Sequence, residues 1–313
     1  MVLLVNGETV EAAGLLEHPR LRAASLLFLA QPAALPADAI ILYACQGEEA
    51  TAESSPEAQD ADRPGSSAVA GAAAAAAGGA EPPLVLSSSD ATTCLIAALV
   101  SSSENTDGGG VAARIVHHDE STTLSPAALR QTVAGLGPRA KLWLAGAYAD
   151  AGGVGARVSS QLLGFLQHCE AALDVRLCCV GTHNTAPDGS PRCTALALDL
   201  ATLAACPAAP PPDQRGPLLP ARMAQWACAA GSAAVGAGGC GSLRSIRFSP
   251  PPRQLRMELR HGRPAPHLLR QAAWLLSLDD QQLLEHWSTS PQHEPPHFPA
   301  GAPLAEKRAG CVQ

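Results

Sequence analysis

The chain has 313 residues, enough to bury one sizeable hydrophobic core or two modest ones, and only 3% of its residues are aromatic. Its formal net charge of -7 argues against nucleic acid or an anionic membrane surface as the main partner. Ten cysteines are scattered along the chain without a Cys-x-x-Cys pair, and we see no secretory signal or membrane-spanning run. We therefore expect reduced thiols and a cytoplasmic location, with the nucleus as an additional compartment.

The first third of the chain combines readable elements with one low-complexity segment. Apolar and amphipathic patterns predict a strand, a helix and a second strand, at residues 1–5, 18–29 and 39–45. Residues 51–82 are dominated by Ala, Glu, Ser, Pro and Gly, with too few large apolar side chains to offset the entropy of ordering. We predict a disordered insertion there, within a single domain formed by residues 1–50 and 83–302.

A β-hairpin with a long Gly- and Ser-rich loop is predicted over the next segment. Its strands are the apolar runs Cys94–Val100 and Val111–His117. If the two runs pair across that loop, antiparallel pairing sets Cys94 opposite His117. A thiol and an imidazole would then lie side by side, where one strand begins and the other ends.

The second half of the chain mixes helices with further strands. The hydroxyl cap and proline at Ser125-Pro126 begin one helix, and residues 157–173 form a second, amphipathic helix. A single strand is predicted at residues 141–148. Two hairpins are predicted after it, one formed by residues 175–180 and 192–200 and the other by residues 243–248 and 255–259. The sequence Pro187-Asp188-Gly189 is expected to turn the first of these hairpins.

The C-terminal part adds one helix and two irregular segments. A helix is predicted at residues 279–287, a Pro- and Ala-rich loop at 203–222 and a flexible tail at 303–313. Several hairpins and a few helices, without a regular βαβ rhythm, favour an α+β fold with a largely antiparallel sheet.

Cys94 and His117 together have the chemistry of nucleophilic catalysis. A thiol with the usual pKa of about 8.5 is only a few per cent thiolate at neutral pH, and a neighbouring imidazole can take its proton. Asp119 lies shortly after His117 and could orient the imidazole ring if the strand continues that far.

Two other interpretations of these residues stand beside catalysis. A cysteine at the start of a strand commonly serves as a small buried hydrophobe, and a one-residue slip of register would point Cys94 and His117 to opposite faces. The run from His117 to Glu120 also resembles a metal-binding cluster. Because adjacent strand residues point to opposite faces, only some of these side chains can converge, and we expect no metal.

Seven short stretches carry a family likeness in the order in which they occur. They are Leu3–Gly7, Leu42–Gln46, Leu86–Cys94, His117–Asp119, Leu142–Asp150, Leu177–Thr185 and Ser288–Phe298. These stretches resemble the protein N-terminal asparagine amidohydrolase family. A fainter likeness is to bacterial chemoreceptor glutamine deamidases, which have a hydroxyl at the spacing of Ser88 before the cysteine. The fold implied is α+β, distantly like that of these cysteine glutamine deamidases.

The resemblance implies hydrolysis of the side-chain amide of an N-terminal asparagine, which yields aspartate and ammonia. In eukaryotes this step prepares a protein for arginylation and ubiquitin-dependent degradation through the N-degron pathway. Cys94 matches the family nucleophile, so a thioester intermediate is expected. The reaction requires no metal or organic cofactor. We expect a monomer whose partners are proteins or peptides with a free N-terminal Asn.

Further site residues follow from the chemistry of that reaction. His117 would act as general base and then as general acid. The Ser88 hydroxyl and the backbone amides around Thr93 and Cys94 are candidates to stabilise the oxyanion. Recognition of a free α-ammonium needs a carboxylate nearby, and the candidates are Asp90, Asp119 and Glu294.

Two alternative functions stay open at this point. The chain could deamidate an internal Asn or Gln, or it could be an inactive relative that binds Asn termini. Ser87 and Ser89 stand where the family has Gly and Asp, and this departure motivates the second alternative.

Overall fold

The computed structural model describes residues 2–53, 82–102, 111–211, 214–215, 243–249, 254–257 and 282. The larger of its two sheets comprises β1 (Leu3–Val5), β2 (Glu8–Val10), β4 (Glu48–Glu53), β6 (Leu95–Ser102), β7 (Val111–His118), β8 (Arg139–Tyr148), β9 (Ala172–Gly181), β12 (Arg244–Ser249) and β13 (Gln254–Met257). The smaller sheet comprises β3 (Ile40–Tyr43), β5 (Leu84–Ser88), β10 (Leu196–Asp199) and β11 (Ala205–Cys206). The helices are α1 (Ala12–Leu15), α2 (Pro19–Leu29), α3 (Glu120–Thr123), α4 (Pro126–Val133) and α5 (Val154–Leu166), with a 3₁₀ turn η3 (Thr182–Asn184).

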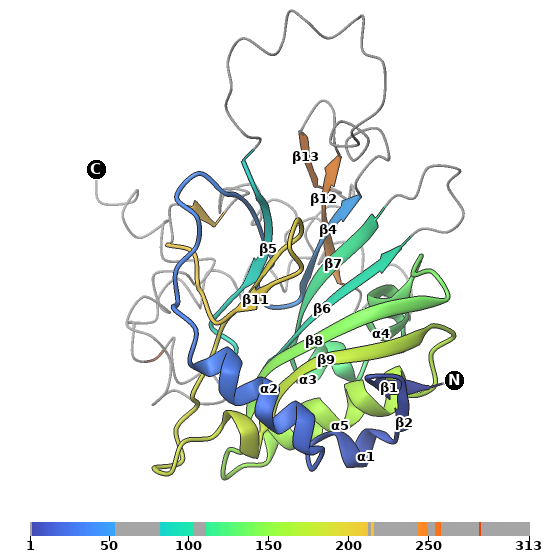
Figure 1. Ribbon diagram of the computed structural model, residues 1–313, viewed down its shortest axis with the longest axis vertical. Coiled ribbons are helices and arrows are strands. Elements are labelled where there is room, and N and C mark those ends of the chain that lie inside the picture. Colours follow the sequence, from blue (N-terminus) through green and yellow to red (C-terminus); the bar gives the residue numbers. More distant parts are fainter. Residues whose placement is uncertain are drawn as a thin grey trace, which may run out of the picture.

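The two sheets pack face to face, and α1, α4 and α5 cover the other face of the larger one (Figure 1). Helix α2 contributes Leu21 to that outer layer and Phe28 to the layer between the sheets. The strand order is β13-β12-β4-β7-β6-β8-β9-β1-β2 in the larger sheet and β11-β10-β5-β3 in the smaller. Most neighbouring strands in the described part run antiparallel, whereas β1–β9, β4–β12, β3–β5 and β8–β9 are parallel. The predicted α+β class is therefore confirmed.

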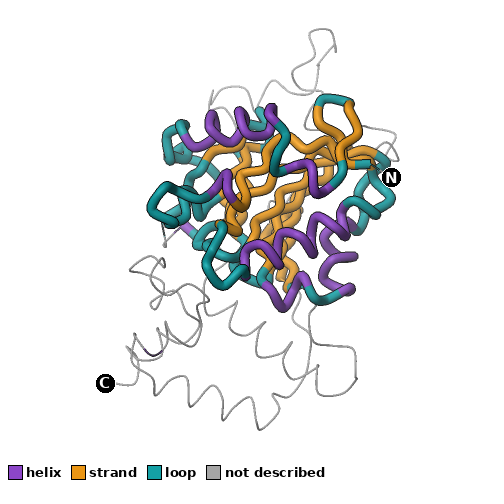
Figure 2. The backbone as a smooth tube through the Cα atoms, turned by 90° about the horizontal axis from the view of Figure 1, so that it is seen from below, coloured by secondary structure: helices purple, strands orange, loops and turns teal. Residues whose placement is uncertain are grey.

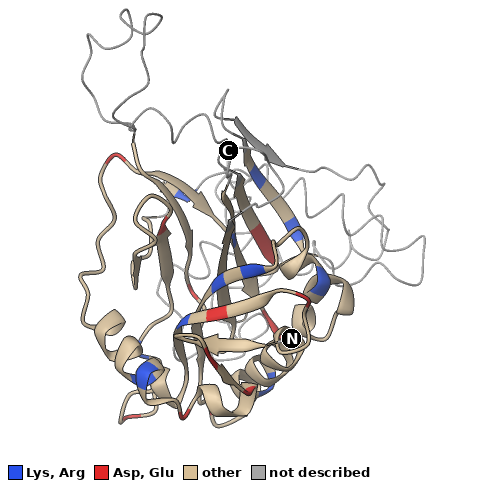
Figure 3. Cartoon of the chain, turned by 45° about the vertical axis from the view of Figure 1, so that its right-hand side comes forward, with Lys and Arg blue, Asp and Glu red and all other residues tan. Residues whose placement is uncertain are grey.

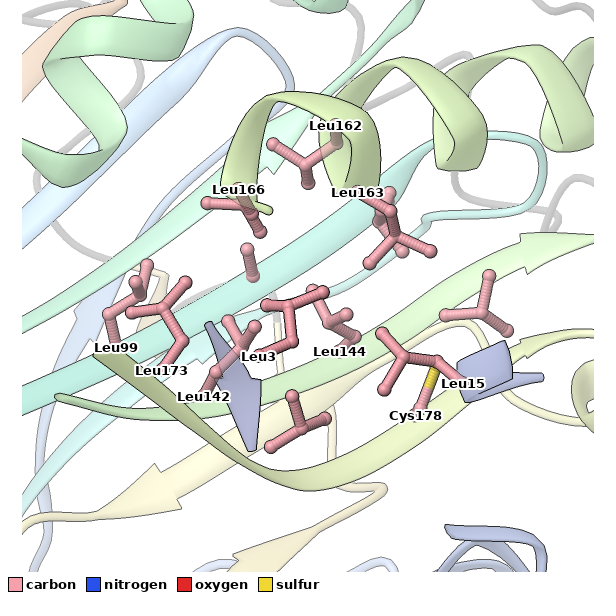
Figure 4. Close-up of a cluster of buried hydrophobic side chains, with 14 of the residues drawn as sticks. Leu3, Leu15, Leu99, Leu142, Leu144, Leu162, Leu163, Leu166, Leu173 and Cys178 are labelled. Atoms are coloured by element: carbon pink, nitrogen blue, oxygen red, sulfur yellow. The ribbon is translucent and has the colours of Figure 1, made fainter. Parts of the chain in front are cut away.

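Alternating side chains on the central strand β6 build the two layers of the core. Leu95 and Leu99 face the helices, whereas Ile96 and Ala98 face the smaller sheet. Because successive strand residues point to opposite faces, a strand covered on both sides reads as a continuous apolar run. Figure 4 shows the helix-side layer, in which leucines of α5 point onto leucines of the sheet.

Local capping explains where several helices begin. The Ser125 hydroxyl accepts a hydrogen bond from the Ala128 amide at 3.3 Å, and Pro126 occupies the first turn of α4. The Asp150 carboxylate likewise accepts hydrogen bonds from the first backbone amides of α5. In the view of Figure 2 the helices lie around the periphery of the strands.

The hairpin of β6 and β7 is confirmed, but its register differs from the prediction. Leu95 pairs with His118 and Ile96 with His117, so Cys94 does not lie directly opposite His117. The shift equals two residues, and it therefore keeps every side chain on its predicted face. Register depends on pairing with β4 and β8 on either side, which composition alone does not reveal.

Two other predictions are wrong. Residues 175–180 and 192–200 do not form a hairpin, because β9 belongs to the larger sheet and β10 pairs with β5 in the smaller one. The turn at Gly189 is instead closed locally by a bridge between Thr185 and Pro191. The second long helix begins earlier and ends earlier than predicted, since residues from Ala172 onward form β9.

Several predictions fall wholly or partly outside the described residues. The predicted insertion starts at residue 51, but residues 51–53 complete β4, and 54–81 are not described. The C-terminal hairpin is confirmed as β12 and β13. Apart from Gln282, the predicted helix at 279–287 lies outside the described residues, as does the tail at 303–313. In the predicted Pro- and Ala-rich loop, Ala205 and Cys206 form the short strand β11, and residues 212–213 and 216–222 lie outside the described residues.

Candidate active site

A row of side chains crosses the inner face of the larger sheet, at the end where β6 begins and β7 ends. Here the inner face means the one that packs against the smaller sheet. The register pairs Ile96 with His117 and Arg244 with Glu48. Continuing the pairing of β4 with β7 by one residue sets Glu48 beside His117. The Gly47 amide donates to the His117 carbonyl at 2.9 Å, which supports that register.

Cys94 lies immediately before β6 and packs, half-buried, against the inner hydrophobic cluster. Its carbonyl accepts a hydrogen bond of 2.6 Å from the Ala147 amide of β8. Because Cys94 precedes Ile96 by two residues, it lies diagonally across the β6–β7 ladder from His117, on the same face. The structure thus brings the predicted thiol and imidazole to one face of the sheet.

The side chain of His117 is held by a residue of the other sheet. Ser88, at the end of β5, places its hydroxyl oxygen 2.9 Å from Nδ1 of His117 and 2.8 Å from the Ala44 carbonyl. A hydroxyl has one hydrogen, and a carbonyl can only accept. Ser88 therefore donates to Ala44, and Nδ1 of His117 donates to Ser88. This pattern assigns the neutral ring the tautomer whose lone pair is on Nε2.

The environment keeps His117 neutral. Burial lowers the pKa of His117 to about 4, although the nearby carboxylates of Asp119 and Asp90 act in the opposite direction. Among the described residues, no group forms a hydrogen bond with Nε2. At neutral pH the site therefore holds a neutral imidazole whose Nε2 lone pair has no partner among the described residues.

Asp119 caps a helix, whereas the sequence had led us to expect a role in orienting the His117 ring. It does not continue β7 but caps α3, where its carboxylate accepts hydrogen bonds from Ser121 and from the amide of Thr122. Its other oxygen accepts from Gln46 at 3.0 Å. Burial opposes ionisation of Asp119, but these hydrogen bonds outweigh it and lower its pKa. Among the described residues, Nδ1 of His117 is oriented by Ser88 and not by this carboxylate.

Asp90 lies on the short loop that leads to Cys94 and has a left-handed backbone, with φ of 65°. Its carboxylate forms an ion pair of 2.7 Å with Arg215. The Arg215 guanidinium also lies over the Tyr43 ring, 5.1 Å from its centroid. The Tyr43 hydroxyl is 2.7 Å from that of Ser89, and burial raises the pKa of Tyr43. These contacts join β3 to the loop before Cys94.

The remaining predicted residues are placed as follows. Thr93 is buried next to Cys94, and Glu294 lies outside the described residues. His118 points to the helix side, opposite to His117, where Nε2 lies 3.0 Å from the Thr132 hydroxyl. Burial lowers the pKa of His118 to about 3. The described part of the chain contains no group of three or more His, Cys, Asp or Glu side chains that could hold a metal ion.

Sequence reasoning missed two charged residues beside the site. Glu48 is almost fully buried, accepts a hydrogen bond of 2.9 Å from the Cys45 amide and has Arg244 at 3.8 Å. The only available signal for Glu48 was its place just after the matched stretch that ends at Gln46. Nothing local pointed to Arg244, which reaches the site through pairing with β4. Elsewhere in the described part, charged residues of both signs are intermixed (Figure 3).

A family comparison places this α+β chain among the hydrolases that act on a linear amide. The model of the family described as protein N-terminal asparagine amidohydrolase matches residues 69–237, more than half of the chain. The chain belongs to this family, as the resemblance of its motifs implied. Membership supports amidohydrolase activity toward N-terminal asparagine. Comparison with curated proteins gives no significant match. Within the described residues, no helix has the length and apolar character needed to cross a membrane.

Proposed function

We propose that the chain hydrolyses the side-chain amide of N-terminal asparagine with Cys94 as the nucleophile. One observation carries this mechanism: Ser88 fixes His117 so that its unprotonated Nε2 lies on the same sheet face as Cys94. The His117 ring is buried, yet its Nε2 has no hydrogen-bond partner among the described residues, whereas both ring nitrogens of buried His118 lie beside threonine hydroxyls. This arrangement supplies both a nucleophile and a base.

The reaction would proceed by acyl transfer. Nε2 of His117 takes the thiol proton while Sγ of Cys94 attacks Cγ of the asparagine, which forms a tetrahedral oxyanion. His117 returns the proton to the amide nitrogen, the C–N bond breaks, and ammonia leaves behind a thioester. A water molecule then attacks the thioester, with His117 again accepting a proton. Aspartate is released and the thiol is restored.

The low pKa of His117 favours one version of this mechanism. Since burial favours the neutral ring, an imidazolium–thiolate pair is not favoured before the substrate arrives. Proton transfer is then coupled to attack on the amide, as in general-base catalysis. The Ser88 hydroxyl hydrogen is committed to Ala44, so backbone amides near Thr93 and Cys94 are better candidates for the oxyanion.

We assign recognition of the substrate α-ammonium to Asp90. Both carboxylate oxygens of Asp119 already accept hydrogen bonds from the cap of α3 and from Gln46. Asp90 lies closer along the chain to Cys94 and is partly exposed, with Arg215 beside it. A substrate ammonium would bind the Asp90 carboxylate together with Arg215, or would displace Arg215 from that carboxylate.

The biological setting that we propose rests on the family resemblance. The product is a protein with an N-terminal aspartate, which suits a step before arginylation in the N-degron pathway. We propose a monomer in the cytoplasm and the nucleus, with no organic cofactor. We also retain a single domain interrupted by a low-complexity insertion, whose start moves to residue 54 because β4 ends at Glu53.

A peptide that begins with Asn tests the proposal. Native protein should convert the terminal Asn to Asp, as followed by ammonia release and mass spectrometry, and Cys94→Ala should abolish conversion. Cys206→Ala is the matched control, because Cys206 is a half-buried thiol that packs with Val85 and Ala197 in a different hydrophobic cluster from Cys94. Full activity of Cys94→Ala would remove Cys94 as nucleophile. Equal turnover of an N-acetylated peptide, or of one with an internal Asn, would instead identify an internal deamidase.

A further inference from the structure

Asn184 is a buried polar residue for which the proposed reaction has no use. It ends the turn η3 after β9, and its side chain is fully buried. Its amide nitrogen donates to the carbonyls of Gly146 at 3.0 Å and Cys193 at 2.8 Å. Its oxygen accepts from the Cys193 amide at 2.8 Å. The carboxamide therefore joins two backbone segments that are distant in sequence.

The first of these segments holds the end of the loop that carries Cys94. Gly146 pairs with Leu95, and the next amide, Ala147, donates to the Cys94 carbonyl at 2.6 Å. A side chain on Gly146 would meet the Cys94 carbonyl at 2.5 Å, which shows how closely the two backbones approach. Ala147 itself has φ of 44°, a conformation that persists only where the surroundings impose it.

The second segment holds the start of the same loop. The backbone carbonyl and amide of Cys193 both form hydrogen bonds with the Asn184 side chain. The carbonyl of the next residue, Thr194, accepts a hydrogen bond of 3.0 Å from the Ala91 amide. The loop from Ala91 to Cys94 is thus anchored at one end by Thr194 and at the other by Ala147, and between them the Tyr148 amide donates to the Thr92 carbonyl at 3.2 Å. Asn184 is bonded to the neighbour of each of the two end anchors.

We propose that Asn184 is a positioning residue, which sets the separation of these two anchors and thereby the placement of the Cys94 thiol. The proposal rests on Cys94 being the nucleophile. Asn184 does not contact the reacting atoms; it acts through Gly146 and Cys193. A shift of about 1 Å at a catalytic group can cost on the order of 100-fold in rate. Loss of Asn184 is therefore expected to reduce kcat much more than it changes KM.

The test compares Asn184→Ala and Asn184→Ser with Ser25→Ala in the full chain. Ser25 is the matched control, because its buried hydroxyl also joins two backbone segments, at Leu21 and Cys178, and among the described residues neither of them is bonded to the Cys94 loop. Folding is monitored by circular dichroism, turnover by kcat and KM on an Asn-initiated peptide, and thiol placement by the rate of Cys94 alkylation by iodoacetamide. We expect a kcat loss of about 10- to 100-fold and an altered alkylation rate for both Asn184 variants, with Ser25→Ala near native.

The readouts separate the two proposals. If native protein does not turn over the peptide but the Asn184 variants still alter Cys94 alkylation, the proposed function fails and the positioning role stands. Folded Asn184 variants with native kcat and native alkylation overturn the positioning role. If Asn184→Ala does not fold, Asn184→Ser decides, because its hydroxyl can still bond one of the carbonyls. A folded Asn184→Ser with native kcat and alkylation then rejects the proposal.

Discussion

Ser88 and His117 belong to different sheets, yet the Ser88 hydroxyl oxygen lies 2.9 Å from Nδ1 of His117. This hydrogen bond crosses the interface between the sheets and links ring orientation to their packing. Because the Ser88 hydrogen is donated to Ala44, Ser88 can only accept from the ring. The catalytic base that we propose is thus oriented by a hydroxyl and not by a carboxylate.

Ser88→Ala should lower kcat by about 10- to 100-fold. Without the Ser88 hydroxyl, Nδ1 of the buried His117 ring loses its hydrogen-bond partner, and the tautomer with the lone pair on Nε2 is no longer fixed. His117→Ala should cost more, on the order of 100- to 10,000-fold. The matched control is Ser87→Ala, because the Ser87 hydroxyl is equally buried and forms no hydrogen bond among the described residues. Its removal should leave turnover and folding stability near native. Native kcat in Ser88→Ala would contradict this role.

Gly146→Ala should destabilise the fold by about 1–3 kcal/mol or more and reduce turnover. Gly146 has φ of 108°, and an added Cβ would lie 2.5 Å from the Cys94 carbonyl. Gly164→Ala is the control, since nothing lies within 4 Å of its added Cβ, and it should stabilise α5 by about 0.5–1 kcal/mol. Urea unfolding measures both changes. Equal stability of the two variants would show that the close approach is tolerated.

The free energy of unfolding should fall as the solution is acidified from pH 7 to pH 4. Burial depresses the pKa of His117 to about 4 and that of His118 to about 3, below the value near 6.5 in an unfolded chain. The unfolded state therefore binds more protons, and the stabilisation is complete only above the unfolded pKa. Each histidine contributes a slope of about 1.4 kcal/mol per pH unit between its two pKa values.

Chemical denaturation at a series of pH values measures this slope. His118→Gln removes one of the two titrating groups without touching the inner face and should make the slope shallower. The lowered pKa of Asp119 acts in the same direction, because its stabilising hydrogen bonds are lost as it is protonated. An unfolding free energy that stays constant from pH 7 to pH 4 would be incompatible with two buried neutral histidines.

The pH dependence of kcat/KM should report His117 as a base of low pKa. Protonation of Nε2 removes the base, so activity is lost on the acid side, with a limb near pH 4 in place of the usual value near 6.5. Unfolding must be followed in parallel, since stability falls over the same range. An acid limb between pH 6 and 7 in fully folded protein would show that His117 is not the buried neutral base described above.

Asp90→Asn should raise KM for a peptide with a free α-ammonium and leave folding nearly unchanged, because the Asp90 carboxylate is partly exposed. Asp174→Asn is a control that also removes a carboxylate from an arginine pair, but far from Cys94 in the sheet. Steady-state kinetics on one peptide, with and without N-terminal acetylation, measure the effect. An unchanged KM in Asp90→Asn would assign α-ammonium recognition to another acid.

Local patterns in the sequence were sufficient for the elements that carry the proposed nucleophile and base. The apolar runs on either side of the Gly- and Ser-rich loop form β6 and β7 as predicted, and Ser125 caps α4. Alternation along a strand also placed His117 and His118 on opposite faces. Such signals depend only on residues close together in the chain, and for this reason they can be read from it.

Tertiary packing decided the rest. The register of β6 against β7, the assignment of β9 and β10 to different sheets, and the contact between Ser88 and His117 all join residues far apart in sequence. Asp119 caps a helix because β7 ends one residue before it. Which partner satisfies a buried polar group depends on which backbones meet in three dimensions, and no local periodicity records that choice.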